Sequence, residues 1–285
     1  MPEIETIRRQ LDPEITGRRI VAAEVLDERW TRPVPPPEVE RALAGRTIEA
    51  VERRGKYLLL RLEGDRTLAM HLRMTGNLLL DDGGADRAYL RARLRLDGGA
   101  DVLFTDPRRF GHAVVLRNHE LDEYFAARLG VEPLSESLTA TELCRLAAGR
   151  RAPLKSFLLN QLGVAGIGNI YADEALHRAE LHPLSPAGSM KPDDCERLRL
   201  GIVEALEAGL RSGGASIDDY LDARGEQGTM QEEFLVHTRE GKPCPRCGSE
   251  IKRIVVAGRS TYFCSNCQRR LRRRPRRRAR ARVAK

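Results

Sequence analysis

The sequence predicts an α+β protein of several domains: an antiparallel β-sandwich with a short N-terminal helix, a helical domain, and a C-terminal β-hairpin that binds zinc. Three observations support this prediction. Apolar and polar residues alternate between positions 19 and 116, apolar residues recur with helical spacing after Gly130, and two Cys-x2-Cys pairs lie near the C-terminus. The 285 residues suffice for two domains and a metal module, and they contain no apolar stretch long enough to span a membrane.

The N-terminal part is expected to begin with a short helix over Glu5 to Leu11, with Ile7 and Leu11 on one face and Pro13 as its end. The proline-rich segment from Arg32 to Pro37 is expected to be a loop. Strands are expected where alternating apolar residues are bounded by turn clusters rich in Gly and Asp. These strands cover residues 20–25, 57–62, 68–72, 78–80 and 90–96.

The segment after Gly130 is expected to be helical, because its apolar residues recur every three or four positions. Gly213-Gly214 is a natural end for the last helix. The expected helices cover residues 139–148, 154–161, 170–179 and 193–210.

Three glycines lie in a tight turn, Leu162 to Tyr171, that opens into the third of these helices. Backbone amides at such a turn, together with the side chain of Asn169, can hold a phosphate. A helical hairpin that needs glycine for positive φ angles is the alternative interpretation of the same residues.

The two Cys-x2-Cys pairs are separated by sixteen residues, a spacing that allows four thiolates to bind one tetrahedral zinc. The ligands are Cys244, Cys247, Cys264 and Cys267. Residues 251–256 and 260–263 are expected to form the two strands of a hairpin between the pairs. Two disulfides or a redox pair are the alternatives, but no signal peptide is evident, which favours a reducing compartment. Cys144 and Cys195 are expected to be ordinary, partly buried cysteines.

The formal net charge of +8 is concentrated at the C-terminus. Residues 269–285 carry eleven positive charges and no acid, so the first 268 residues have a net charge of −3. This tail is expected to be disordered and to bind polyanions without sequence readout. A tail that serves only solubility is the alternative.

The N-terminus reads Met1-Pro2-Glu3. Removal of Met1 would expose the secondary amine of Pro2, and an α-amino group is partly unprotonated at neutral pH. Such an amine condenses with an aldehyde to an iminium ion, and Glu3 is placed to transfer protons. A solvated chain end with no chemical role is the alternative.

Seven motifs, taken in order, resemble the formamidopyrimidine-DNA glycosylases, relatives of endonuclease VIII. They are Pro2-Glu3, Gly55-Lys56-Tyr57, His71 to Gly76, Asp106 to Gly111, Gly130 to Leu134, Ala165 to Tyr171 with Asp173 to Leu176, and the four-cysteine hairpin. The resemblance implies a catalytic β-sandwich (residues 1–130), a helix-two-turns-helix domain (131–238) and a zinc finger (239–268), with the basic tail (269–285) outside it.

The resemblance also implies roles for single residues. Pro2 would attack C1′ of the damaged nucleotide while Glu3 transfers protons. Phosphates of double-stranded DNA would be held by Lys56, His71, Asn169 and Arg259, with Lys56 and Arg259 counted in the catalytic site. The gap left by the extruded base would be filled by Met74, Arg108 and Phe110.

The function implied is a bacterial DNA-repair enzyme, monomeric, cytoplasmic and associated with the nucleoid. It would excise 8-oxoguanine and formamidopyrimidines opposite cytosine, with one structural zinc, and cleave the strand by β,δ-elimination. The chain starts three residues shorter than the usual Pro-Glu-Leu-Pro-Glu-Val-Glu-Thr, which leaves two alternatives open. One is an endonuclease VIII-like activity on oxidised pyrimidines; the other is a non-catalytic binder of damaged or abasic DNA. Glu5 is the nearest candidate for the second glutamate of the motif, and a lesion-sorting lid is expected over 216–230.

Overall fold

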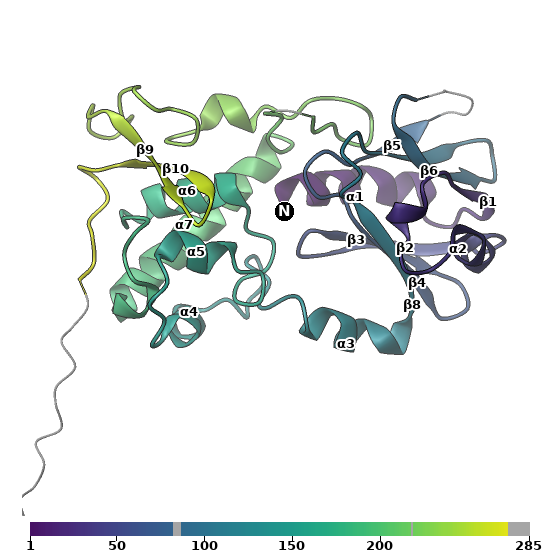
Figure 1. Cartoon of the computed structure of the whole chain (residues 1–285), viewed down its shortest axis with the longest axis horizontal. Coiled ribbons are helices and arrows are strands. Elements are labelled where there is room, and N and C mark those ends of the chain that lie inside the picture. Colours follow the sequence, from purple (N-terminus) through teal and green to yellow (C-terminus); the bar gives the residue numbers. More distant parts are fainter. Residues whose placement is uncertain (82–86, 218, 273–285) are drawn as a thin grey trace, which may run out of the picture.

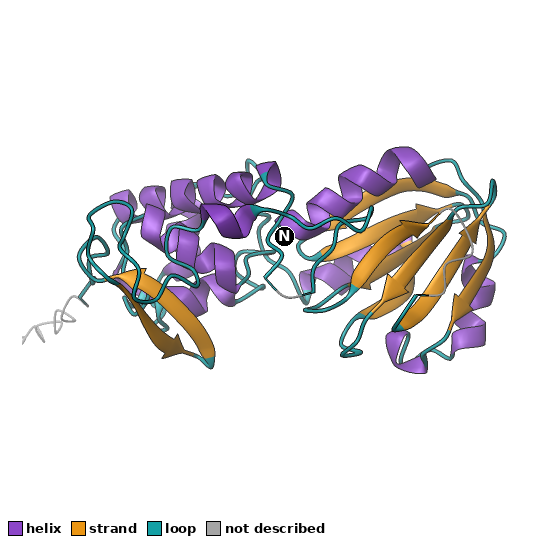
Figure 2. Cartoon of the chain, turned by 90° about the horizontal axis from the view of Figure 1, so that it is seen from above, coloured by secondary structure: helices purple, strands orange, loops and turns teal. Residues whose placement is uncertain are grey.

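The computed structural model describes residues 1–81, 87–217 and 219–272. A β-rich half and a helical half lie side by side, and the amino terminus lies between them (Figures 1 and 2). Within the described chain, no helix is long and apolar enough to cross a membrane.

The β-rich half is a sandwich of two four-stranded antiparallel sheets, as predicted. Leucine, isoleucine and valine side chains from the sheets and from α1 fill the space between them. The first sheet has the order β1 (Ile20–Val25), β6 (Leu90–Leu96), β7 (Asp101–Thr105) and β5 (Asn77–Asp81). The second has the order β2 (Ile48–Arg54), β3 (Tyr57–Leu62), β4 (Arg66–His71) and β8 (His112–Arg117).

Three of these strands, β2, β7 and β8, were not predicted individually. All five residues of β7 are buried, so this strand has no alternation of apolar and polar residues to detect.

Helix α1 (Pro2–Ile15) is longer at both ends than the predicted segment, and the prediction that Pro13 ends it is wrong. Pro13 lies on the exposed face, where water can satisfy the carbonyl that loses its N–H partner. On the opposite face, Ile7, Leu11 and Ile15 are fully buried. Their burial holds the last turn in place despite the proline.

The segment predicted as a proline-rich loop also contains a helix. Helix α2 (Pro36–Leu43) has proline in its first turn, where no N–H is required, and it buries Val39 and Leu43 at i and i+4. A third short helix, α3 (Leu121–Ala126), follows β8 and covers the outer face of the second sheet through Leu121 and Phe125.

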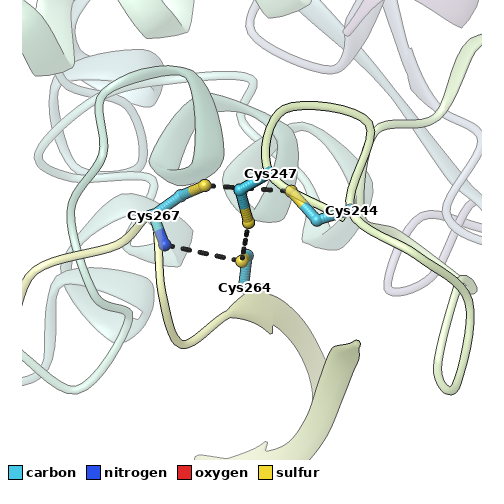
Figure 3. Close-up of side chains that lie close together, drawn as sticks. All are labelled: Cys244, Cys247, Cys264 and Cys267. Atoms are coloured by element: carbon cyan, nitrogen blue, oxygen red, sulfur yellow. Dashed lines mark hydrogen bonds between the residues drawn. The ribbon is translucent and has the colours of Figure 1, made fainter. Parts of the chain in front are cut away.

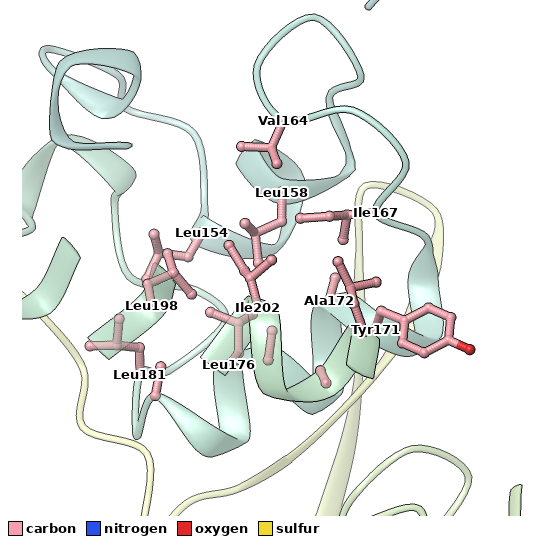
Figure 4. Packing of buried hydrophobic residues seen from close by; sticks show 14 of the residues in the cluster. Leu154, Leu158, Val164, Ile167, Tyr171, Ala172, Leu176, Leu181, Leu198 and Ile202 are labelled. Atoms are coloured by element: carbon pink, nitrogen blue, oxygen red, sulfur yellow. The ribbon is translucent and has the colours of Figure 1, made fainter. Parts of the chain in front are cut away.

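The helical half contains the four predicted helices: α4 (Ala140–Ala147), α5 (Leu154–Leu159), α6 (Asn169–Arg178) and α7 (Pro192–Arg211). Their apolar stripes meet in one core (Figure 4). Helices α6 and α7 approach closely at Gly201, where an added Cβ would lie 2.6 Å from the carbonyl oxygen of Ala175. The side chain of Met1 joins this core, so the first residue of the β-rich half packs into the helical half.

The predicted hairpin forms from β9 (Ile251–Val256) and β10 (Arg259–Cys264). Ala257 and Gly258 make the turn between them, both with positive φ. The hairpin is attached to α6 through the buried carboxylate of Glu174, which accepts hydrogen bonds from the backbone N–H groups of 235–237.

The start of the predicted disordered tail is part of the fold. Arg269 donates its backbone N–H to the Glu180 carbonyl, its side chain pairs with Asp194, and Leu271 is buried against the helical core. The prediction is therefore wrong for residues 269–271. Residues 273–285, which the same prediction covers, lie outside the described residues.

Cys144 and Cys195 form a disulfide, so their prediction as ordinary cysteines is wrong. Packing of α4 against α7 brings their Cα atoms to 5.7 Å, within the range that a disulfide requires. The bond closes a loop across 51 residues of the helical domain.

We expect Cys195→Ala to lower the free energy of unfolding by about 2–4 kcal/mol, because an unfolded chain without the cross-link gains entropy. Urea unfolding checks this. Cys144→Ala should cause a similar decrease, and the double variant should be little less stable than either, because all three break the same bond. Rapid alkylation of both thiols in the folded, unreduced protein would contradict the assignment.

Candidate active site

A cavity of about 260 Å³ lies where the two halves meet around the amino terminus, and we call it the junction cavity. It brings together residues of both halves. Its walls include Met1, Glu3, Lys56, His71, Met74, Asn169, Tyr171, Ala215 and Tyr220.

The amino-terminal amine, which belongs to Met1, is buried, and Oε2 of Glu3 lies 3.0 Å from it. Burial lowers the pKa of this amine to about 6, despite the opposing effect of the Glu3 charge. Pro2 is the first residue of α1 and is buried. The structure thus places Pro2 and Glu3 at the junction of the two halves.

The Glu3 carboxylate also accepts hydrogen bonds from the Tyr171 hydroxyl at 2.8 Å and the Ala215 backbone N–H at 3.4 Å. Burial alone would raise the pKa of Glu3, but the terminal charge and the hydrogen bonds outweigh burial, so the pKa is lowered. Glu3 is therefore ionised at neutral pH and able to accept a proton. The sequence predicts no role for Tyr171 itself, because nothing local indicates a contact across 168 residues.

Lys56 lies in the two-residue turn between β2 and β3 and reaches the glycine turn, where its Nζ donates to the Ile167 carbonyl at 3.1 Å. Gly168 leaves room for this approach, because a Cβ there would lie 3.3 Å from Nζ. Burial lowers the pKa of Lys56 to about 8; the charge of Glu3 opposes this, and those of Arg259 and Arg73 add to it. Lys56 thus lies within electrostatic reach of both Glu3 and Arg259.

His71, at the end of β4, is neutral. Burial, aided by the charge of Arg73, lowers its pKa to about 3. Its Nδ1 accepts the backbone N–H of Arg73 at 3.0 Å, so the proton of the neutral ring is on Nε2. His71 therefore offers an uncharged N–H donor.

Asn169 begins α6 and connects the glycine turn to the zinc hairpin, because its Nδ2 donates to the Ser260 carbonyl at 3.0 Å. Its Oδ1 is buried without a hydrogen-bond partner in the described chain. Arg259, next to Ser260, is exposed at the start of β10. The four predicted phosphate ligands, Lys56, His71, Asn169 and Arg259, thus come from separate elements and gather at one place.

The three predicted gap-filling residues also come together, on two neighbouring loops. Arg108 places its guanidinium 4.7 Å from the centre of the Phe110 ring, and its Nη1 lies 4.0 Å from the Met74 sulfur. Met74 and Phe110 are 55% and 52% exposed, which is unusual for large apolar side chains.

The loop that carries Arg108 and Phe110 is held by the fully buried carboxylate of Asp106. It accepts the hydroxyl of Thr75 and the backbone N–H groups of Arg108, Phe110 and Gly111. Since Thr75 follows Met74, this one carboxylate fixes both gap-filling loops. No local pattern in the sequence indicates this role of Asp106.

The four predicted zinc ligands converge (Figure 3), and their sulfur atoms lie within 4.8 Å of one another. The Cys244–Cys267 and Cys247–Cys264 sulfur distances are 3.9 and 3.5 Å, close to the edge of a tetrahedron with Zn–S bonds of about 2.3 Å. The residues fit one structural zinc. His177 of α6 lies 3.4 Å from the Cys244 sulfur and links the metal module to the helical core.

Two further expectations concern residues beside the cavity. The predicted lid contacts α1 through Tyr220, whose hydroxyl donates to the Glu3 carbonyl, and through Asp222, which accepts from the Gln10 side chain. It contacts β5 through Asn77, whose side chain accepts the Leu221 N–H and donates to the Asp219 carbonyl. Glu5 does not line the junction cavity; its carboxylate pairs with Arg8, Arg9 and Arg53.

Comparisons with known proteins agree on one family. The model of the Formamidopyrimidine-DNA glycosylase N-terminal domain matches residues 1–113 and that of the H2TH domain matches residues 129–220. A zinc finger found in FPG and IleRS matches residues 241–270.

Curated relatives match over nearly their whole length. The Formamidopyrimidine-DNA glycosylases of Chloroflexus aurantiacus and a Roseiflexus species are 45% and 44% identical, and the alignments cover 94% of this chain and 96% and 99% of theirs. A Lactococcus lactis FPG mutant bound to Fapy-dG containing DNA superposes with a TM-score of 0.89 at 33% identity, covering 95% of this chain and 99% of the other. These comparisons show that the chain belongs to the formamidopyrimidine-DNA glycosylase family of DNA-repair enzymes.

Proposed function

We propose that the protein excises oxidised purines, 8-oxoguanine and formamidopyrimidines, from double-stranded DNA opposite cytosine, and then cleaves the strand at the abasic site. The observation that carries this proposal is the gathering of the amino terminus, Glu3 and three of the four phosphate ligands, Lys56, His71 and Asn169, in one cavity between the halves. Solved relatives are complexes with DNA that contains Fapy-dG or an abasic site, which supports the substrate class.

In the proposed reaction, the amine of Pro2 attacks C1′ after Met1 has been removed, and the bond from C1′ to the base breaks. Glu3 is ionised and contacts the amine of Met1 in this structure. In the trimmed protein it accepts the proton that the attacking Pro2 amine loses. The base departs with the bonding electrons and takes a proton from water. The C1′–O4′ bond then breaks, O4′ takes the proton held by Glu3, and the opened sugar is left as an iminium at C1′. This iminium acidifies the C2′ hydrogens, so loss of the 3′ phosphate and then of the 5′ phosphate follows. Lys56, His71, Asn169 and Arg259 hold the backbone phosphates during these steps.

The extruded base leaves a gap, which Met74, Phe110 and Arg108 are proposed to fill. Met74 and Phe110 are exposed and apolar, as insertion into a base stack requires. Arg108 can donate to the acceptors of the orphaned cytosine. An endonuclease VIII-like activity on oxidised pyrimidines is the second candidate, favoured by the short N-terminus and by a Lactococcus lactis Fpg complex with an oxidised pyrimidine.

Borohydride trapping tests the nucleophile. With the methionine-trimmed protein and an 8-oxoguanine·cytosine duplex, we expect a covalent adduct that mass spectrometry maps to Pro2. Glu3→Gln should slow base release about 10²–10⁴-fold, the usual contribution of a positioned acid or base. Parallel duplexes with a formamidopyrimidine and an oxidised pyrimidine decide between the two candidate activities.

A matched variant separates a misplaced proline from a protein that only binds DNA. It carries Met-Pro-Glu-Leu in place of Met1, which gives the chain the longer start of its relatives. An adduct in this variant alone would contradict the assignment of Pro2 as nucleophile. Lesion-selective binding without an adduct in either protein would favour the non-catalytic binder.

Binding to DNA should weaken as the pH rises from 7 to 9, by up to about tenfold. The pKa of Lys56 is about 8, so the free protein loses this charge over that range, while a bound phosphate requires it. Fluorescence anisotropy checks the affinity. The arginine in Lys56→Arg stays charged over this range, so this variant should bind DNA with almost the same affinity at pH 7 and pH 9. If its affinity fell with pH as much as that of the wild-type protein, Lys56 would be excluded as the source of the pH dependence.

Removal of zinc should abolish specific DNA binding, because Arg259 and the Ser260 carbonyl lie on the hairpin that the metal holds. A chelator with metal analysis and an electrophoretic shift assay tests this. Arg259→Gln, which leaves all four cysteines in place, shows how much of the effect is due to the arginine. Full binding after verified zinc removal would contradict the prediction.

A further inference from the structure

A second cavity, of about 600 Å³, adjoins the junction cavity, and we call it the lateral cavity. It lies between the ends of β4 and β8, the C-terminal end of α3 and the loop at Gln161–Leu162. Its lining includes Arg32, Lys56, Arg73, Arg128, His71 and His112 and no aspartate or glutamate. Because cations line it without any carboxylate, its chemistry suits an anion.

Two of these cations, Arg73 and Arg128, form no ion pair within the described chain. Arg32 differs, because it pairs with Glu28. Arg73 and Arg128 are both exposed, so both are available to a ligand.

Arg73 is held by its backbone rather than by its side chain. Its φ is +60°, a conformation that favours glycine, and its N–H donates to His71 Nδ1. Its charge contributes to lowering the pKa of Lys56, His71 and His112, which places the guanidinium near all three. The side chain therefore extends the cluster of phosphate ligands beyond the junction cavity.

Arg128 lines the same cavity and follows α3 in the chain. Its guanidinium lies 3.8 Å from the centre of the Tyr124 ring, and its Nη1 donates to the Tyr124 carbonyl at 2.8 Å. In the same lining, His112 stacks on His71 with ring centres 5.6 Å apart. Burial lowers the pKa of His112 to about 4, so its ring is neutral and adds an uncharged donor.

We propose that Arg73 and Arg128 together bind one further phosphate of the lesion strand, next to the phosphates held by Lys56 and His71. The two cavities share Lys56, His71 and Arg73, so a strand that leaves the first enters the second. The proposal rests on the proposed function only in that the ligand is DNA; it requires binding and no catalysis.

The salt dependence of DNA affinity tests this proposal. The slope of log affinity against log salt falls by about 0.9 for each phosphate that the protein no longer neutralises. We expect this full decrease for the double variant, Arg73→Gly with Arg128→Gln, which leaves the phosphate without a cation. Either single variant should show a smaller decrease, because the remaining arginine still neutralises the shared phosphate. Arg41→Ala, which removes an exposed charge on α2 away from both cavities, is the matched control and should leave the slope unchanged.

Single neutral methylphosphonates along the lesion strand then locate the phosphate. At one position the substitution should weaken binding by the wild-type protein but not weaken binding by the double variant any further. An unchanged slope in the double variant would overturn the proposal. A decrease of about 0.9 in each single variant and about twice that in the double variant would also overturn it, because it would mean two separate phosphates. If no covalent adduct forms on Pro2, the proposed catalytic function fails but this binding test can still be made. If the wild-type protein does not bind DNA at all, the proposed function and the proposed phosphate site are both overturned.

Discussion

The amino-terminal turn of α1 is the contact on which the rest of the site depends. Ile7 and Leu11 of this helix belong to the core of the sandwich, and Glu3 in its first turn accepts hydrogen bonds from the Tyr171 hydroxyl and the Ala215 backbone of the helical half. These contacts do not involve Met1, so they do not depend on its presence. One helix thus fixes the separation of the halves and places the amine where their surfaces converge.

The electrostatics of the junction follow from this arrangement. Outside the last seventeen residues the chain is slightly acidic. Even so, Lys56, Arg73 and Arg128 line the two cavities, whose linings contain no carboxylate other than Glu3. Burial and repulsion from the neighbouring positive charges keep the two histidines neutral and lower the pKa of Lys56 to about 8 in the free protein. A polyanion relieves this repulsion, so the site is organised for a phosphate backbone before one arrives.

Two buried carboxylates support the surfaces that face the DNA. Asp106 fixes both loops that carry Met74, Arg108 and Phe110, and Glu174 ties the chain entering the zinc hairpin to α6. Because each accepts several backbone N–H groups, each positions a whole segment rather than one side chain. The functional residues can therefore be exposed and still have defined positions.

Features encoded over short distances could be predicted from the sequence alone. The spacing of Cys244 to Cys267 indicated the zinc site, and alternation and helical spacing indicated a β-rich half and a helical half. The ordered motifs included Glu3, Lys56, His71, Met74 and Asn169, which line the junction cavity. Contacts between distant segments depended on packing. The length of α1 past Pro13, the Cys144–Cys195 disulfide and the contact of Tyr171 with Glu3 were decided only by the tertiary structure. Local patterns reflect the geometry of a single helix or strand, whereas these contacts form only when separate elements bury their apolar faces against each other.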